Sequence, residues 1–302
     1  MPRTSPTRSL KILVPAKVNL FLRVGNQRRD GYHSIETVFH TVGLWDEIVI
    51  KPSVSFGFSA HGLPSPEDRS NLCVRAFDLI REHARSGLNA SIRLVKRIPP
   101  GAGLGGGSAD AAACLAGLDR FWRLGLGQPA LTRLASNLGS DVPFFIRGGA
   151  ALGTGRGNVL RSLRSRLDRW CVILKPAFGV LTRAAYARLD SSRRETTRSG
   201  TRPRGQSVVA AITRGRLPGS EVHNDFEPVV SRLYPKIGMI LRRMKETGLS
   251  PVFMTGSGSA VVGLAGNRGA AKAVARSLGK ELKVWGTEAR LAPLTMRFVS
   301  RP

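Results

Sequence analysis

A run of glycines about a third of the way along the chain is the densest group of residues that could do chemistry. Between Pro99 and Asp110 the sequence reads Pro-Pro-Gly-Ala-Gly-Leu-Gly-Gly-Gly-Ser-Ala-Asp, after a strand-like stretch and before a helix-like one. Glycines let several backbone N–H groups converge, and the start of a helix adds partial positive charge. The segment therefore predicts a loop that binds phosphate groups.

Known phosphate-binding loops differ in the residues around their glycines. A Walker A loop needs a lysine directly before its Ser or Thr, and none lies between Gly101 and Ser108. Gly101, Gly103 and Gly106 match the spacing of a dinucleotide-binding loop, but two prolines separate them from the strand and no acidic residue closes a second strand. A protein-kinase glycine loop lies between strands, whereas a helix follows here. A tight turn without a ligand is a further alternative, although it does not need the entropic cost of so many glycines.

The remaining pattern, Pro-x3-Gly-Leu-Gly-x-Gly-Ser before an alanine-rich helix, resembles the GHMP kinases, a family that includes galactokinase and the homoserine and mevalonate kinases. Two further segments resemble family motifs near the two ends of the chain: Pro15–Leu20 (Pro-Ala-Lys-Val-Asn-Leu) and Thr255–Ala260 (Thr-Gly-Ser-Gly-Ser-Ala). Three motifs in this order are far more specific than any one alone. The resemblance implies ATP binding by Pro99, Pro100, Gly101, Ala102, Gly103, Leu104, Gly105, Gly106, Gly107, Ser108 and Ala109.

Other segments resemble the members of the family whose acceptor is a cytidine diphosphate-linked methylerythritol. These segments are Asp30–His33 with Glu36, Thr37 and Phe39, then Gly106–Ala112, Gly139–Phe145 and Asn224–Glu227. The resemblance spans roughly residues 10–265. It implies direct transfer of the ATP γ-phosphate to the 2-hydroxyl of that acceptor, in the non-mevalonate isoprenoid pathway. A homoserine- or mevalonate-type acceptor is the alternative within the family.

Two residues are expected to carry the catalysis. Asp141 stands between Gly-Ser and Val-Pro, where a carboxylate could accept the hydroxyl proton as the new bond forms; in the resembled family this position is the catalytic base. Lys17 lies in an apolar strand, and its charge could hold the Asp141 carboxylate and the acceptor oxygen. The structural alternative for Asp141 is a turn carboxylate that accepts from local N–H groups. For Lys17 it is a lysine at a strand edge.

A second group is expected to bind substrate. Asn19 projects to the same face as Lys17, because strand side chains repeat every two residues. Aromatic rings and a base-edge hydrogen bond from Tyr32, His33 and Phe39 suit a pyrimidine, and the resembled family uses the Gly-Tyr-His segment for cytidine; core packing is the alternative for Phe39. The resemblance adds the turn that shapes the site beside the triphosphate, Gly256, Ser257 and Gly258.

Ser108 is expected to close the phosphate loop where the helix starts. Its hydroxyl could cap the helix or reach a phosphate or Mg²⁺. Many GHMP kinases carry a second Ser at the next position, where this chain has Ala109, so a hydroxyl ligand is absent there. Mg²⁺ is still expected, because ATP chemistry needs its charge neutralised.

The chain is strongly basic, with 47 Lys and Arg against 20 Asp and Glu and a formal net charge of +27. Such a charge suggests nucleic-acid binding. The basic residues are spread along the chain, however, and only 6% of residues are aromatic, so an arginine-rich surface without a specific nucleic-acid partner is predicted. The expected partners are two small molecules, ATP and the acceptor, whose capture the charge could aid. A basic nucleic-acid-binding protein on the same fold is the alternative from another class.

Cysteine usage and hydropathy predict a cytoplasmic protein. Cys73, Cys114 and Cys171 lie far apart without a Cys-x-x-Cys pair, which favours a reducing compartment over disulfides or a zinc site. The sequence has no run of ~18 apolar residues, and the apolar stretch before Lys17 is too short for a signal peptide. No membrane partner is expected, and the chain is expected to act as a monomer or a homodimer.

The elements that must position these residues suggest an α+β protein with the two-lobed GHMP kinase fold and the site in the cleft between the lobes. The N-terminal lobe is predicted over 9–160 and the C-terminal lobe over 168–302. Residues 191–219 carry seven Arg and one acid and are expected to form a surface insertion or mobile loop. Periodicity predicts strands in 9–24, 45–60, 91–97, 141–153, 170–175, 251–255 and 260–264, and helices over 71–85, after the glycine loop, over 131–138, near 182–189 and 231–247, and over 268–278 with Asn267 as its cap.

Overall fold

The computed structural model describes residues 9–84, 87–194 and 205–300, which form helices packed on a mixed sheet. The strands in chain order are β1 (Leu10–Gln27), β2 (His33–Pro52), β3 (Gly57–Gly62), β4 (Ala90–Lys96), β5 (Ala150–Thr154), β6 (Val159–Leu163), β7 (Arg169–Lys175), β8 (His223–Asn224), β9 (Val252–Met254), β10 (Val261–Ala265), β11 (Trp285–Leu291) and β12 (Arg297–Ser300). The helices are α1 (Leu72–His83), α2 (Gly106–Trp122), α3 (Gly127–Leu138), α4 (Val142–Arg147), α5 (Thr182–Arg194), α6 (Gly205–Thr213), the 3-10 turn η1 (Gly219–Glu221), α7 (Phe226–Leu233), α8 (Pro235–Glu246) and α9 (Arg268–Leu282). The mixture confirms the expected α+β class.

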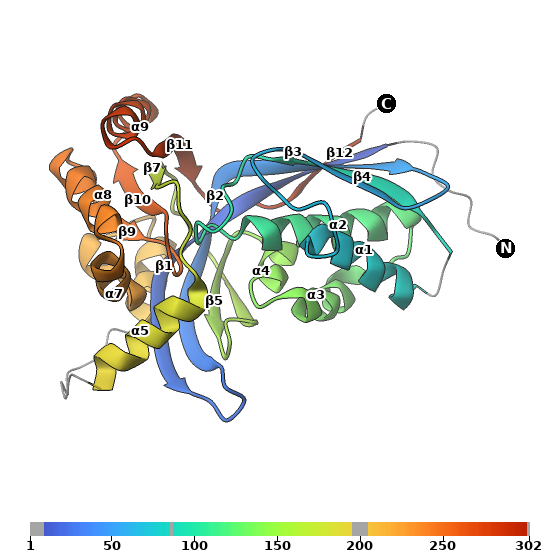
Figure 1. Ribbon diagram of the computed structural model, residues 1–302, viewed down its shortest axis with the longest axis horizontal. Coiled ribbons are helices and arrows are strands. Elements are labelled where there is room, and N and C mark those ends of the chain that lie inside the picture. Colours follow the sequence, from blue (N-terminus) through green and yellow to red (C-terminus); the bar gives the residue numbers. More distant parts are fainter. Residues whose placement is uncertain (1–8, 85–86, 195–204, 301–302) are drawn as a thin grey trace.

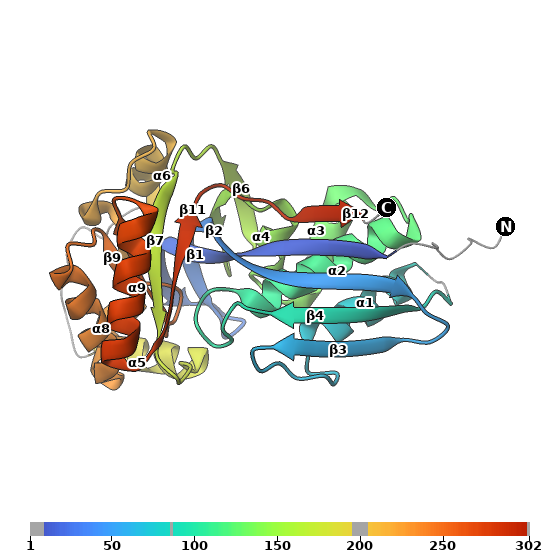
Figure 2. The same cartoon turned by 90° about the horizontal axis from the view of Figure 1, so that it is seen from above.

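Strands β1 and β2 form a long antiparallel ribbon through the middle of the molecule (Figures 1 and 2). The sheet order is β12-β1-β2-β11-β7-β10-β9, and β4 with β3 and β5 with β6 branch from β2. The β1–β2 register shifts between Pro15 and Ala16, because proline has no N–H to give to a ladder. The extra residues, Gly43 and Leu44, lie on β2, so β1 continues as one strand through the proline.

Helices α1 to α4 cover one face of the sheet in the first half of the chain (Figures 1 and 2). The apolar alternation of the strands points toward these helices, so Ile12, Ile48 and Leu94 are fully buried in one core with Phe77 and Leu118. This packing positions the starts of α2 and α4, which border the candidate active site.

In the second half of the chain, α8 and α9 pack beside β7, β9, β10 and β11 (Figure 2). Helix α9 begins as predicted at Asn267, whose side-chain oxygen accepts a 2.9 Å hydrogen bond from the Ala270 N–H. One sheet contains strands from both sides of residues 160–168, and the lobe boundary placed there stays a prediction.

The strand expected over 141–153 is wrong in its first half. Residues Val142–Arg147 form helix α4, with Pro143 in its first turn and Gly148 at its end in the left-handed region (φ 69°). A short apolar run such as Phe144–Ile146 has no periodicity that separates a strand from a buried helix. The strand begins only at Ala150.

The mobile loop expected over 191–219 is also wrong for the described part of that range. Helix α5 continues to Arg194, and α6 buries Val208 and Ile212 completely in a core with β1 and β2 residues. Residues 195–204 lie outside the described residues. The apolar side chains of α6 therefore outweigh the surrounding arginines in deciding its structure.

Candidate active site

A cavity of about 270 Å³ lies where β1, the glycine loop, the start of α4 and the start of α5 meet. Its lining includes Lys17, Asn19, Asp141 and the turn Gly256–Gly258. These residues are spread over most of the chain in sequence, and the fold gathers them around one space.

Lys17 and Asp141 face each other in this cavity. The Lys17 ammonium is 3.4 Å from Asp141 Oδ2 and donates a 2.6 Å hydrogen bond to Asn19 Oδ1. Only 4% of the Lys17 side chain is exposed, against 33% for Asp141. A buried ammonium must be compensated by partners, and these two side chains provide them. The expected face shared by Lys17 and Asn19 is present in the structure.

Two threonines that the sequence did not single out as site residues hold Asn19 in place. The Asn19 side-chain amide donates to Thr37 Oγ1 at 2.7 Å, and Thr37 in turn donates to the Phe21 carbonyl. The Asn19 backbone N–H donates to Thr255 Oγ1 at 3.0 Å. Thr255 comes from the β9–β10 turn, so this contact joins the two ends of the chain at the site.

The glycine loop is held between β1 and the β9–β10 turn. The Lys17 N–H donates to the Leu104 carbonyl at 3.0 Å, and the Ala260 N–H donates to the Ala102 carbonyl at 3.1 Å. Gly103 has φ +75°, and a Cβ built there would lie 2.2 Å from the Thr255 carbonyl oxygen. Glycine is therefore required at this position by both backbone conformation and space.

The loop leads into α2, a helix of 17 residues whose first turn points its free N–H groups back to the loop. Gly105 is the N-cap and no side chain caps the helix, so the capping role considered for Ser108 is wrong. Ser108 is half-buried in the first turn, while Ala109 is fully buried and its side chain faces the core. Several other residues of the expected ATP set also have buried side chains, namely Pro99, Ala102 and Leu104.

A buried ionic group lies beneath the loop and was not found from the sequence. The Lys96 ammonium contacts Asp46 Oδ2 and lies 2.6 Å from Asp110 Oδ2. Burial raises the pKa of the Asp110 carboxyl well above its usual range, against the opposing effect of Lys96. Burial also disfavours the Lys96 charge, yet the two carboxylates raise the pKa of Lys96 overall. A Cβ on Gly106 would lie 2.6 Å from the Lys96 ammonium, so this group packs directly against the start of α2.

A second space of about 650 Å³ adjoins the first and shares Asp141 and Tyr186 with it. It is bordered by the tip of the β1–β2 hairpin, where Tyr32 is 56% exposed under the Arg156 guanidinium, 3.8 Å from the ring centroid. His33 Nε2 lies 3.0 Å from Asp190 Oδ1. The hairpin tip therefore presents polar and aromatic groups beside the catalytic pair.

Helix α5 supplies the opposite wall of this second space. His33 stacks on Tyr186, with 4.8 Å between ring centroids. Burial, and then the carboxylates of Asp141 and Asp190, raise the pKa of Tyr186 to about 12. Thr182, Tyr186 and Asp190 recur every four residues and so share one helix face. This spacing was the signal for them, but such a stripe is also common on surface helices.

Phe39 lies at the floor of the first cavity. Its ring is 1% exposed and packs on Phe144 with 5.0 Å between centroids, and the Lys17 ammonium is 5.4 Å from its centroid. Its main role in the described structure is thus in the core, with one edge toward the site.

The segment Asn224–Glu227 supports the β9–β10 turn, and its Phe226 lines the cavity. The Asn224 side-chain amide donates at 2.8 Å to the carbonyls of both Met254 and Gly256. Glu227 accepts from the Met254 N–H at 2.8 Å, and burial raises the pKa of this carboxyl. These bonds hold Gly256, Ser257 and Gly258 against the cavity, where Ser257 Oγ is 3.0 Å from Thr182 Oγ1.

The arrangement combines a carboxylate, a buried cation and a phosphate-type loop around one space. A hydroxyl placed beside Asp141 could lose its proton to the carboxylate, and the loop amides could hold the phosphates of a donor. Within residues 9–84, 87–194 and 205–300, no group of three His, Cys, Asp or Glu side chains gathers to hold a metal. None of the helices in these ranges is both long and apolar enough to span a membrane.

Comparisons with known proteins give matches to one family of kinases. Residues 71–149 match the N-terminal domain of the GHMP kinases and residues 208–284 match the GHMP kinase C-terminal domain. A 4-diphosphocytidyl-2-C-methyl-D-erythritol kinase from Moorella thermoacetica is 40% identical over 266 residues, 87% of this chain and 92% of the relative. A relative of the same name from Mycolicibacterium gilvum is 38% identical over 275 residues, 88% of this chain and 85% of the relative.

Solved structures of kinases are also similar to this chain. A crystal structure of 4-(cytidine 5'-diphospho)-2C-methyl-D-erythritol kinase is 35% identical, with a TM-score of 0.77 over 93% of this chain and 99% of that one. A homoserine kinase from Cytophaga hutchinsonii has a TM-score of 0.72 at 18% identity, over 99% of this chain and 100% of that chain, and therefore shares the fold alone.

Proposed function

The chain belongs to the 4-diphosphocytidyl-2-C-methyl-D-erythritol kinases, a family of GHMP kinases, and on that premise we propose that it transfers the γ-phosphate of ATP to the 2-hydroxyl of 4-diphosphocytidyl-2-C-methyl-D-erythritol. This is a step of the non-mevalonate isoprenoid pathway. The observation that carries the proposal is the Lys17–Asp141 pair, which lies between the glycine loop and the space beside the hairpin tip.

Asp141 is the proposed base of the transfer. As the acceptor oxygen bonds to the γ-phosphorus and the bond to the ADP oxygen breaks, the hydroxyl proton passes to the Asp141 carboxylate. The Lys17 ammonium, 3.4 Å from that carboxylate, fixes its position and offsets the charge that develops on the acceptor oxygen. Asn19 holds the ammonium through its 2.6 Å hydrogen bond, so the pair needs little reorganisation during the reaction.

The glycine loop and the start of α2 are proposed to hold the ATP phosphates. Backbone N–H groups there have no partner within the helix and carry partial positive charge. Mg²⁺, bound chiefly by the phosphates, would neutralise their charge. The proposed protein ligand is the hydroxyl of Ser108, in the first turn of α2.

The cytidine end of the acceptor is proposed to lie in the larger space. The support is the stacked pair of His33 and Tyr186 and the exposed Tyr32 ring at the hairpin tip. Asp190 orients the His33 ring from α5, which leaves its other edge for a base.

The enzyme is proposed to act in the cytoplasm, without a specific nucleic acid and as a monomer or a homodimer. Cys73, Cys114 and Cys171 are buried free thiols, which fits a reducing compartment. ATP and the acceptor are the only partners that the reaction needs.

The base is tested by ADP release with ATP, Mg²⁺ and the cytidine acceptor. Asp141→Asn is expected to lower kcat by about 10²–10⁴-fold, with little change in KM for ATP. Asp78→Asn is the matched control, because Asp78 is exposed on α1 outside both spaces. A rate near wild type in Asp141→Asn would remove Asp141 as the base.

The acceptor is tested with His33→Ala. We expect KM for the cytidine acceptor to rise about 10-fold while KM for ATP is unchanged, since a lost hydrogen bond and stack are worth about 1.4 kcal/mol. His61→Ala, an exposed position on β3, serves as control. Turnover of homoserine or mevalonate at a comparable rate would favour the other acceptor classes.

A further inference from the structure

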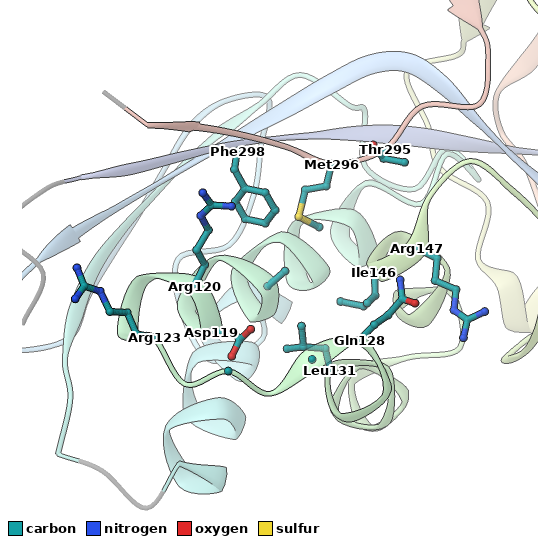
Figure 3. A pocket seen from close by; sticks show the side chains of 13 residues that line it. Asp119, Arg120, Arg123, Gln128, Leu131, Ile146, Arg147, Thr295, Met296 and Phe298 are labelled. Carbon is teal, nitrogen blue, oxygen red and sulfur yellow. The ribbon is translucent and has the colours of Figure 1, made fainter. Parts of the chain in front are cut away.

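A cavity of about 590 Å³ opens between the helical layer and the segment that contains β12, and most of its lining side chains are labelled in Figure 3. It lies between the end of α2, the start of α3, the end of α4 and the segment that contains β12. It shares no lining residue with either space of the candidate active site. Its size is that of a typical small-molecule site.

The middle of this cavity is apolar. Leu131 from α3, Ile146 from α4, and Met296 and Phe298 from the segment of β12 contribute its apolar side chains, and Figure 3 shows them between the charged residues. Leu131 is buried, while the other three are partly exposed to the space. Such a surface favours a ligand with an aliphatic part.

Arginines stand at both ends of the cavity. Arg120 comes from the last turn of α2, Arg123 directly follows that helix, and Arg147 is at the end of α4 (Figure 3). Within the described part of the chain, no carboxylate forms an ion pair with any of the three. The only acid in the wall, Asp119, accepts the Leu126 N–H at 2.9 Å. The wall therefore carries an excess of positive charge.

The arginines differ in how they are engaged. The Arg120 guanidinium lies 5.0 Å from the Phe298 ring centroid, and one nitrogen of Arg147 donates to Ser162 Oγ at 3.3 Å. Arg120 lies in the last turn of α2 and Arg123 directly follows the helix, so both side chains belong to the same end of α2. Their forked donors suit the oxygens of a phosphate or similar anion.

Arg123 also has a left-handed backbone conformation that glycine usually adopts at helix ends. It follows α2 with φ +55°, in the left-handed region. A side chain there carries a steric cost that glycine avoids. The chain nevertheless has an arginine at this point, and its side chain lines the cavity.

We propose that this cavity is a second ligand site, which takes a small amphiphile with a phosphate-type anion on an apolar chain. Arg120 and Arg123 bind the anion, and Leu131, Ile146 and Met296 cover the chain. The proposal does not depend on the reaction proposed for the first site.

The test is calorimetric titration of the full chain with octyl phosphate below its micelle concentration. A non-hydrolysable ATP analogue is present at saturation, so that the glycine loop is occupied. One equivalent of octyl phosphate is expected to bind. Inorganic phosphate and octanol, which each present half of the ligand chemistry, are expected to bind at least about 10-fold more weakly.

Three variants locate the binding. Arg120→Gln and Arg123→Gln are each expected to weaken octyl phosphate about 10-fold, because each removes a charged donor. Met296→Gln is expected to weaken octyl phosphate but not inorganic phosphate. Arg133→Gln is the matched control, since Arg133 is exposed on α3 outside the cavity.

The arginine variants change exposed side chains and should fold as the native chain does. Their melting temperatures in thermal unfolding check this. Octyl phosphate binding that no cavity variant changes, or that is no tighter than binding of inorganic phosphate, would overturn the proposal. Loss of binding in Arg133→Gln equal to that in Arg123→Gln would reduce it to general attraction to a basic surface.

Discussion

Lys17 is a charged side chain inside an apolar strand, and its neighbours explain why the fold tolerates it. Asp141 and Asn19 compensate its charge, but taking an ammonium out of water still costs free energy. An apolar side chain of similar length would avoid that cost. The position is therefore one where catalytic and structural demands differ.

Lys17→Met separates these demands. We expect kcat to fall about 10²–10³-fold, because the charge beside the acceptor oxygen is lost. The melting temperature is expected to stay the same or rise, because Met fills the space without a desolvation cost. Lys11→Met on the same strand, where the lysine pairs with Glu47 near the surface, is the control and should keep full activity. A fall in stability equal to the fall in activity would contradict this.

At the same scale, sequence reasoning placed Lys17, Asn19 and Asp141 together but missed Lys96 and Asp190. The first set lies in motifs whose order along the chain is specific. Lys96 ends an ordinary strand, and its partners are 50 and 14 residues away in sequence. Only the packing of α2 on β2 and β4 brings these charges together, and no local pattern encodes that packing.

At the scale of elements, the glycine loop connects distant parts of the chain by hydrogen bonds. Its carbonyls accept from β1 and from Ala260, and Gly103 touches the Thr255 carbonyl. The loop was predicted because its composition is unusual, whereas α4 was mistaken for a strand because six residues hold less than two helical turns. Helix α6 was missed because the charge of its flanks hid a short apolar face.

Gly103→Ala tests the close contact between the glycine loop and the β9–β10 turn. We expect the free energy of unfolding to fall by about 3 kcal/mol and KM for ATP to rise, because the new methyl meets the Thr255 carbonyl at an unfavourable φ. Gly248→Ala has the same kind of φ (+79°) with no atom within 4 Å, so it isolates the backbone cost of about 1 kcal/mol. Equal costs in urea unfolding of the two variants would show that close contact at Gly103 plays no part.

At the scale of the whole molecule, the net charge of +27 gives no information about where the chemistry lies. The described cavities use few of these charges, and the class of the protein followed from its motifs. Buried titratable groups affect global stability more directly. Burial lowers the pKa of His40 to about 4, against the raising effect of its bond to the Thr41 carbonyl.

His40 therefore makes stability depend on pH. Its folded pKa is below its unfolded value, so the unfolded chain binds the proton more readily, and stability is lost as pH falls from about 6.5 to about 4. The shift corresponds to about 3 kcal/mol in total. Denaturant unfolding across this range should show a shallower pH dependence in His40→Gln than in the native chain. His61→Gln, an exposed position, should keep the native slope; an unchanged slope in His40→Gln would contradict the prediction.

Helix α4 connects the candidate active site with the arginine-lined cavity. It is six residues long, roughly 9 Å, with the Asp141 carboxylate at its start and Arg147, a wall of the second cavity, at its end. A shift of the whole helix would therefore move both residues together. An amphiphile that moved α4 as a whole would also move the Asp141 carboxylate, and the coupling would be reciprocal. The factor by which the amphiphile changed the affinity for the acceptor would equal the factor by which the acceptor changed the affinity for the amphiphile.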